Sequence, residues 1–416
     1  MTTSKSACHR RGDCRLCNSS DLELVLGLAP TPPANAFVPA DRLDEVQAVF
    51  PLDLFQCNVC GHVQLLDVVD PEILFADYVY VSGTSPVFVK HFEDYAGKVV
   101  ADYAPPAGVL ALDIGSNDGT LLGFFKQQGL TVLGVDPARA IAADATARGI
   151  ETLNSFFDQA LARQLRADRG AAHVITANNV FAHADDLGGI TAGIADLLHD
   201  DGVFVFEVSY LLDVYENTLF DTIYHEHVAY HTVAPLIGFF RKYGLELVAA
   251  ERIGTHGGSL RGYVRKAGRA EVTASVGELV ALEKAAGLND PATLKAFAAK
   301  IEAVGQELQA IIRDARAQGR RIAAFGAPAK ATTLMYQFGL EAADIEFIID
   351  DSPLKQGLYS PGKHIPVLPA TAISGRKPDD LVVLAWNFAD SIMDKHRAFC
   401  DEGGRFIVPL PSVRIV

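Results

Sequence analysis

The sequence predicts an α/β chain made of a small cysteine-rich N-terminal module and two domains of alternating strands and helices. Two Cys-x2-Cys pairs lie near the N-terminus, at 14–17 and 57–60. An apolar strand that runs into a glycine-containing turn and a helix occurs twice, at 109–122 and 321–334. With 416 residues, the chain is also too long for one ordinary core. We therefore divide it into 1–82, 83–285 and 286–416.

Composition narrows the class of protein. The formal charge is -15, from 51 acidic residues against 36 Lys and Arg, and no basic block stands out, so we expect no nucleic-acid partner. Residues 1–13 are polar and lack the apolar core of a signal peptide. No apolar run is long enough to span a bilayer. We expect a cytoplasmic protein that has no membrane partner.

The paired cysteines predict a zinc site. Without a secretory signal, such pairs favour metal over disulfides, and four thiolates complete a tetrahedral Zn²⁺ site: Cys14, Cys17, Cys57 and Cys60. Four protein ligands leave no open position, so we interpret the zinc as structural. Reduced, unliganded cysteines are the alternative, and His9 could replace one ligand. The proline-rich segment 18–56 predicts a loop-rich module with little core, which metal binding would stabilise.

The turn after the strand at 109–113 predicts a cofactor site. Gly115 and Gly119 permit a tight turn and a close backbone approach to a ligand. A second strand at 131–135 ends at Asp136, whose carboxylate can accept hydrogen bonds from both ribose hydroxyls. Dinucleotide enzymes share this layout. The Asp-x-Gly-x-x-x-Gly spacing nevertheless resembles motif I of class I methyltransferases, which implies S-adenosyl-L-methionine (SAM). The expected SAM contacts are Asp113, Gly115, Ser116, Asn117, Gly119, Asp136, Pro137, Ser155, Phe156, Asn178 and Asn179.

Residues 223–233 concentrate three histidines, two tyrosines and a carboxylate. His225 and His227 could chelate a metal together with a carboxylate. The stretch could instead be a polar rim without chemistry. In a third interpretation one histidine is a general base that removes a proton beside a substrate carbonyl. That interpretation fits a neighbouring SAM site best, because carbon methylation needs a carbanion or enolate.

The chain closely resembles the three-domain sugar C-methyltransferases that act on dTDP-4-keto-deoxysugars. The matching motifs cover almost the whole chain: the two cysteine pairs, Tyr-x-Tyr at 78–80, DIGSNDG at 113–119, ANNVFAH at 177–183, YHEH at 224–227 and THGGSLR at 255–261. The resemblance implies that His227 is the base. It also implies that Glu226 holds a sugar hydroxyl or phosphate-side group, that Tyr224 assists, and that the family's further tyrosine and histidine are Tyr80 and His183.

The last third of the sequence predicts a long helix and a second Rossmann-like domain. Asp290 and Pro291 suit a helix start, and an apolar stripe then recurs until Gly319. A strand-turn-helix unit follows, whose helix N-terminus could bind a pyrophosphate. The expected contacts to a nucleotide sugar are Lys330, Thr332, Thr333, Tyr359, Lys363, His364 and Asn387. The alternative is a domain that only dimerises; we expect a monomer or a homodimer.

The resemblance implies a SAM-dependent C-methyltransferase that methylates C3 of a dTDP-4-keto-deoxysugar. One alternative is a SAM-dependent methyltransferase of another small metabolite, with a carbon, oxygen or nitrogen acceptor. Another is a zinc-ribbon RNA-modifying or RNA-binding protein, which the acidic balance and the absence of an Asn-Pro-Pro-Tyr motif after 177 oppose. A catalytically silent scaffold is the third.

Overall fold

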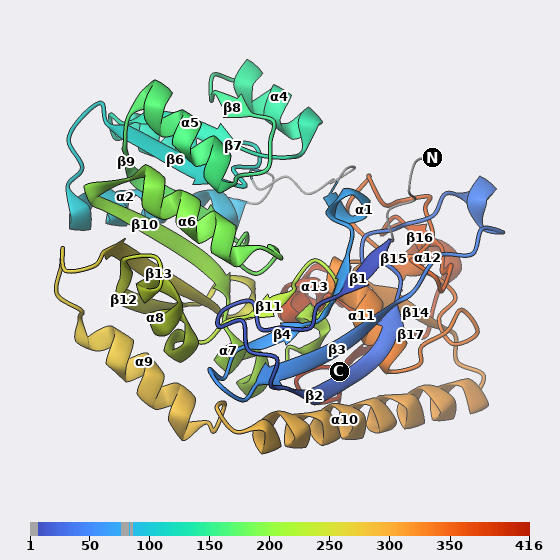
Figure 1. The fold of residues 1–416 in the computed structure, drawn as a ribbon. Helices are drawn as coiled ribbons and strands as arrows, with labels where there is room; N and C mark the ends of the chain where they lie inside the picture. The colour runs from blue at the N-terminus through green and yellow to red at the C-terminus, as the bar shows by residue number, and fades with distance from the viewer. Residues whose placement is uncertain (1–6, 76–82, 84–85) are drawn as a thin grey trace, which may run out of the picture.

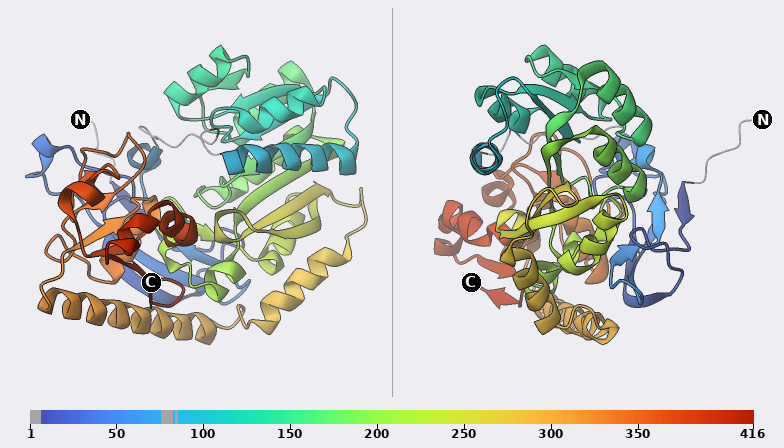
Figure 2. Two further views of the ribbon diagram at one scale, coloured as in Figure 1. Left: turned by 180° about the vertical axis from the view of Figure 1, so that it is seen from behind. Right: turned by 60° about the vertical axis from the view of Figure 1, so that its left-hand side comes forward.

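The computed structural model describes residues 7–75, 83 and 86–416, so Tyr78 and Tyr80 lie outside the described residues. The described chain forms a seven-stranded sheet, a six-stranded sheet, a four-stranded sheet and a two-stranded ribbon. Figure 1 shows the N-terminal strands β2 and β3 beside the C-terminal domain, with the long helix α10 running below both, and the left view of Figure 2 shows the same arrangement from behind. No described helix is both long and apolar enough to cross a membrane.

The N-terminal module contains more regular structure than its prolines suggest. β2 and β3 form a long antiparallel pair, and β3 alternates buried and more exposed side chains as a half-buried strand does. Leu52 and Leu54 of β3 are buried, so the expectation of a module with little core is wrong. Pro32, Pro33 and Pro39 lie in the connection between the two strands. Proline has no backbone N–H, and at these positions its absence interrupts no hydrogen bond between strands. The elements are β1 (Cys8–Arg10), β2 (Leu22–Thr31), η1 (Ala40–Arg42), β3 (Phe50–Cys57), β4 (Val63–Leu65), β5 (Asp67–Val69) and α1 (Pro71–Phe75).

The sheet of this module is completed by a distant part of the chain. β11 (Ala229–Tyr230) pairs antiparallel with β4, which gives the order β11-β4-β3-β2. β11 follows His227 by one residue, so the predicted catalytic stretch leads directly into the sheet of the cysteine-rich module. The domain limits at 82/83 and 285/286 stay predictions.

The middle sheet has the order β12-β13-β10-β9-β6-β7-β8, and β13 is antiparallel to both of its neighbours. The central parallel strands β6 and β9 are buried on both faces along most of their length, as a doubly covered sheet requires. Leu110, Leu112 and Ile114 pack on the face covered by α5 and α6, whereas Ala111 packs on the opposite face with α2 and α3. The strands are β6 (Leu110–Ile114), β7 (Thr131–Val135), β8 (Thr152–Leu153), β9 (Ala172–Asn178), β10 (Leu198–Ser209), β12 (Leu245–Ile253) and β13 (Ser259–Lys266).

Helices and short turns connect these strands. β10 begins at Leu198 and its pairing with β9 has a register shift before Val203. The helices are α2 (Pro86–Tyr103), α3 (Thr120–Gln127), α4 (Arg139–Ala147), α5 (Gln159–Arg169), α6 (Leu187–Leu197), α7 (Leu211–Glu216), α8 (Val233–Arg241) and α9 (Ala274–Ala285), with short η3 (Phe220–Thr222) and η4 (Thr255–Gly257).

The C-terminal part begins with α10 (Pro291–Ala317), the long helix of Figure 1. The Asp290 carboxylate accepts the Ala292 N–H at 2.9 Å, as the predicted cap requires. The six-stranded sheet has the order β16-β15-β14-β17-β18-β19, and only β19 is antiparallel to its neighbour. The elements are β14 (Ile322–Phe325), α11 (Ala329–Gln337), β15 (Ile348–Ile349), β16 (Val367–Leu368), α12 (Ala372–Arg376), β17 (Asp380–Val383), η5 (Trp386–Phe388), α13 (Ala389–Lys395), α14 (Arg397–Asp401), β18 (Arg405–Val408) and β19 (Arg414–Ile415).

Candidate active site

The four predicted zinc ligands converge on one point. The ligand sulfurs of Cys14, Cys17, Cys57 and Cys60 all lie within 4.8 Å of one another. The Cys14–Cys60 and Cys17–Cys57 sulfur pairs are 3.6 and 3.4 Å apart. Tetrahedral Zn–S bonds of about 2.3 Å would separate the sulfurs by about 3.8 Å. The cluster therefore fits a tetrahedral zinc ion after a small expansion.

The turn between β6 and α3 has the left-handed backbone that its glycines suggested. Gly115 and Gly119 have φ of 68° and 75°, and Asn117 between them has φ of 50°. The Asn117 N–H donates to Asp136 Oδ2 at 2.8 Å, which joins this turn to the end of β7. The other oxygen of Asp136 accepts the Ala138 N–H at 2.8 Å. Both loops thus meet at the carboxyl edge of the sheet, where doubly wound folds bind ligands.

Buried polar atoms at this edge fit a bound cofactor. In the described part of the chain, neither amide atom of Asn178 has a hydrogen-bond partner, nor does the Ser116 hydroxyl. Asn178 ends β9, and Asn179 follows with φ of 58°. Because unpaired buried polar groups are costly, these atoms suit a polar ligand such as the amino-acid part of SAM.

The remaining predicted SAM residues divide into two groups. Ser155 and Phe156 lie on a loop tied back to β7, since the Ser155 N–H donates to Asp136 O and the Asn154 amide to Pro137 O. Phe156 is 57% exposed, so its ring is available to an adenine face. Asp113 instead accepts the Thr176 hydroxyl at 2.6 Å between β6 and β9, and burial raises its pKa to about 7. Its SAM contact stays a prediction.

The predicted catalytic residues that the structure describes come together around His227, whereas Tyr80 lies outside the described residues. The His227 ring centroid lies 4.3 Å from that of Tyr224 and 4.9 Å from that of His183. His227 Nδ1 lies 2.8 Å from Thr222 O. A carbonyl only accepts, so Nδ1 carries the proton and the basic lone pair of the neutral ring is on Nε2.

Glu226 lies beside this group in a buried position. Its carboxylate accepts the Asn35 amide N–H at 2.9 Å, and burial raises its pKa to about 7. Burial and the neighbouring His227 hold the pKa of His183 well below its usual range. Asn35 belongs to the proline-rich connection of the N-terminal module, and no sequence feature singled it out.

His225 and His231 are buried and support the surrounding backbone. His225 Nε2 donates to Phe50 O at 3.2 Å, and His231 Nε2 donates to Phe181 O at 3.0 Å. Burial lowers the pKa of each to about 4, so both are neutral at physiological pH. Among the described residues, the four-cysteine cluster is the one group with converging metal ligands. The alternative of a metal held by His225, His227 and a carboxylate therefore receives no support.

The C-terminal domain contacts the same stretch through α11. The Thr333 hydroxyl donates to Ile223 O at 2.8 Å and the Thr332 hydroxyl donates to Ala34 O at 3.0 Å. Lys330 Nζ lies 3.6 Å from Asp221 Oδ2 and 4.1 Å from the centroid of the Trp386 ring. These side chains hold the C-terminal domain against the catalytic stretch and its surroundings. The sequence did not predict this contact between domains.

The other predicted substrate contacts are more scattered. The Tyr359 backbone exchanges two hydrogen bonds with that of Val38. Lys363 pairs with Glu341 and stacks on Tyr336, while His364 has φ of 51°. Asn387 is exposed in η5.

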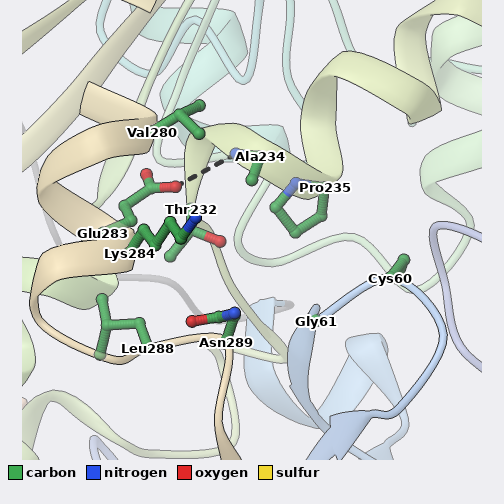
Figure 3. Close-up of a pocket in the computed structure, with 10 residues that line it drawn as sticks. All are labelled: Cys60, Gly61, Thr232, Ala234, Pro235, Val280, Glu283, Lys284, Leu288 and Asn289. Carbon is green, nitrogen blue, oxygen red and sulfur yellow. Dashed lines mark hydrogen bonds between the residues drawn. The ribbon is translucent and has the colours of Figure 1, made fainter. Parts of the chain in front are cut away.

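A cavity of about 150 Å³ separates the N-terminal module from α8 and α9 (Figure 3). Its buried carboxylate, Glu283, accepts the Tyr210 hydroxyl at 2.8 Å and the N–H groups of Val233 and Ala234 at the start of α8. Glu283 therefore caps that helix, and the cavity contains none of the predicted catalytic residues.

A second cavity, of about 350 Å³, lies at the carboxyl ends of β14, β15 and β17. The strand order reverses here, because β15 pairs with one side of β14 and β17 with the other. Phe388, 62% exposed, lies on its wall, and Lys395 and Asp351 form a 2.7 Å ion pair beside it. The lining is Phe325, Gly326, Asp350, Asp351, Ala385, Phe388, Ser391, Ile392 and Lys395, which includes none of the seven predicted substrate contacts.

Comparison with known proteins covers nearly the whole chain. Family models match at residues 14–75 (zinc binding domain), 90–250 (methyltransferase domain) and 254–411 (C-methyltransferase C-terminal domain). C-methyltransferase NovU of Streptomyces niveus is 34% identical over 405 residues, which cover 97% of this chain and 96% of that protein.

Solved structures align with the methyltransferase part. Magnesium protoporphyrin IX methyltransferase of Synechocystis PCC 6803 with bound SAH is 18% identical, covers 42% of this chain and 83% of that chain, and gives a TM-score of 0.34. PH0226 of Pyrococcus horikoshii OT3 is 14% identical, covers 45% of this chain and 94% of that chain, and gives a TM-score of 0.37. Both scores are below 0.5, so the assignment rests on the sequence matches. The chain belongs to the family of SAM-dependent C-methyltransferases that carry an N-terminal zinc-binding domain.

Proposed function

We propose that this C-methyltransferase acts on a dTDP-linked 4-keto-deoxysugar and methylates C3, the carbon next to the ketone. The observation that carries the proposal is the packing of His183 and Tyr224 against His227, beside the buried Glu226. A C–H bond next to a ketone can lose its proton to a histidine because the charge moves onto the ketone oxygen. The nature of the sugar comes from the family resemblance of the motifs.

In the proposed reaction His227 is the general base. Its Nδ1–H is held by Thr222 O, so Nε2 takes the C3 proton. The electron pair of the broken C–H bond forms the enolate, and neutral His183 or the Tyr224 hydroxyl donates to the ketone oxygen. Bound SAM supplies an electrophilic methyl group. C3 bonds to that methyl as its bond to sulfur breaks, and the proton stays on His227.

Glu226 is proposed to hold a sugar hydroxyl. Its pKa of about 7 lets it donate or accept near neutrality, and Asn35 fixes one of its oxygens. Tyr80 is proposed as the family's further catalytic tyrosine, and it lies outside the described residues.

The nucleotide is proposed to bind the C-terminal domain. The cavity at the strand-order reversal supports this, because doubly wound folds bind nucleotides at such points. The exposed Phe388 ring offers a stacking surface for a base. Lys330 is proposed as a phosphate contact, with the backbone at the start of α11 beside it. The hydroxyls of Thr332 and Thr333 already donate to carbonyls, so neither hydroxyl is proposed as a phosphate contact.

Replacing the base tests the proposal. His227→Ala should bind SAM and the sugar nucleotide within about twofold of the wild-type affinities, and lose about 10²–10⁴-fold in turnover. Exchange of the C3 proton with deuterated solvent should fall by the same factor, because that step precedes methyl transfer. His199→Ala is the matched control, since His199 is a partly exposed histidine that stacks on His173. Unchanged turnover in His227→Ala would exclude His227 as the general base.

A further inference from the structure

The zinc knuckle contains a buried cation that is not a zinc ligand. Arg15 lies between the ligands Cys14 and Cys17, and its side chain is 0% exposed. A buried guanidinium needs charged and polar partners around it. The partners of Arg15 lie outside the knuckle, on segments that lead to both predicted catalytic histidines.

One partner is on the His183 loop. Arg15 Nε donates to Asp185 Oδ1 at 3.1 Å, and the terminal nitrogen Nη2 lies 2.9 Å from the same oxygen in an ion pair. Asp185 follows His183 by two residues, in the turn where the His183 N–H donates to Val180 O. Two nitrogens of one planar group on a single carboxylate fix both distance and orientation.

The other partners, Gln64 and Leu65, connect Arg15 to the segment that carries His227. The second terminal nitrogen of Arg15 donates to Leu65 O at 2.5 Å and to Gln64 Oε1 at 3.0 Å. The Leu65 N–H donates to Val228 O at 2.9 Å, and Val228 is the neighbour of His227.

These bonds close a ring. The Val228 N–H donates to Ala182 O at 2.7 Å, next to His183. The chain of contacts thus runs from Arg15 through Asp185 to the His183 loop, across to Val228, and back through Leu65 to Arg15. The Arg15 guanidinium therefore connects both histidine-bearing segments to a knuckle that the zinc site holds closed. Arg11 Nη1 adds a second hydrogen bond to Asp185 Oδ1 at 3.0 Å.

We propose that Arg15 and Asp185 are positioning residues, through which the zinc-held knuckle sets the placement of His183 relative to His227. The inference rests on the proposed roles of those histidines. It gives the zinc-binding domain a part in the reaction: the metal supplies no chemistry, but the knuckle fixes the reacting geometry. A displacement of about 1 Å at a reacting centre can cost about 10²-fold in rate, so a modest loosening would be visible.

Arg15→Lys keeps the charge and loses the planar fork, and Arg15→Gln loses both. Both should keep a full complement of zinc and the SAM affinity, with KM for the sugar nucleotide within about threefold. We expect kcat and C3 proton exchange to fall together, by about 10-fold in Arg15→Lys and about 10²-fold in Arg15→Gln. Asp185→Asn should resemble Arg15→Lys, and combining it with Arg15→Gln should add little.

Lys242→Met is the matched control. Lys242 Nζ donates to Leu16 O at 2.7 Å, so it binds the same knuckle without contacting either histidine-bearing segment. Its kcat should stay within about twofold of wild type. Histidine side-chain ¹⁵N spectra, recorded without substrate, should show the His183 and His227 resonances displaced in the Arg15 variants and unmoved in Lys242→Met.

Two outcomes would overturn the positioning role. One is an Arg15→Gln enzyme with wild-type kcat and unmoved histidine resonances. The other is a loss of kcat that only follows a loss of zinc, or that Lys242→Met reproduces. If wild-type enzyme neither exchanges nor methylates the keto-sugar, the proposed substrate fails instead. The histidine spectra then still decide whether Arg15 positions the two rings.

Discussion

Asp221 is a fully buried carboxylate where the catalytic stretch meets the C-terminal domain, and we predict that Asp221→Asn loosens that contact. Asp221 Oδ2 accepts the Trp386 indole N–H at 2.6 Å and faces Lys330 Nζ at 3.6 Å. Burial raises the pKa of Asp221 and lowers that of Lys330, and the attraction between the two charges opposes both shifts. The asparagine can still accept the indole N–H but leaves the ammonium unpaired.

The distance gives the scale of the effect. Two unit charges 3.6 Å apart attract by roughly 4–5 kcal/mol at an effective dielectric constant near 20. Removing one partner of a buried pair typically costs about 3–5 kcal/mol. The Lys330 side chain is 14% exposed and retains its contact with the Trp386 ring, and both features reduce the cost of leaving its charge unpaired. We therefore expect Asp221→Asn to lower the free energy of unfolding by about 3 kcal/mol.

The assay uses a single natural probe. Trp386 is the one tryptophan of the sequence, so its fluorescence follows unfolding at this contact in urea. Asp221→Asn should lower the free energy of unfolding by the stated amount, and adding Lys330→Met should restore part of it, because the unpaired charge is gone. A loss below about 1 kcal/mol, or a double variant as unstable as the sum of the single ones, would refute the reasoning.

Three further predictions concern the zinc, the cofactor and pH. Chelating the zinc should expose the amides of β2 and β3 to hydrogen exchange, because structural zinc contributes about 10–16 kcal/mol in small domains; retained protection would contradict its structural role. Asp136→Asn should weaken SAM binding by about tenfold in calorimetry, with exposed Asp102→Asn as control, since a charged acceptor of hydroxyls is lost; equal affinities would exclude Asp136 as a contact. Burial raises the pKa of Glu226 from 4.5 to about 7, so the folded state keeps a proton that the unfolded state releases in this range. The stability of wild type relative to Glu226→Gln should therefore fall by about 3 kcal/mol as pH rises through that window, and urea titrations that show a rise instead would reverse the assignment.

Features that depend on neighbours in the chain were predicted well. The two cysteine knuckles, the left-handed turn at 115–119 and the Asp290 cap each need only a few adjacent residues in a fixed geometry. The order of strands and helices followed from apolar runs and the turns between them, which placed Asp136 and Asn178 at strand ends. Segment 18–56 was mispredicted, because it contains the paired strands β2 and β3, and Pro32, Pro33 and Pro39 lie in the connection between them.

Contacts between domains could not be predicted from the sequence. Thr332 and Thr333 looked like ligand contacts at a helix N-terminus, but their hydroxyls donate to carbonyls far away in the chain. A free hydroxyl and a satisfied one are identical in a sequence, and the difference lies in which domain packs against them. Asn35, the partner of Glu226, escaped notice for the same reason.

By itself, then, the sequence determined the chemistry available: four thiolates for zinc, a SAM turn, and a histidine-rich stretch suited to proton transfer. The tertiary structure decided how these parts are joined. It made the chain after His227 a strand of the zinc module's sheet and placed Arg15 between two distant loops. The physical reason is that residue type and spacing fix what a group can bind, whereas packing between domains fixes which partner it meets.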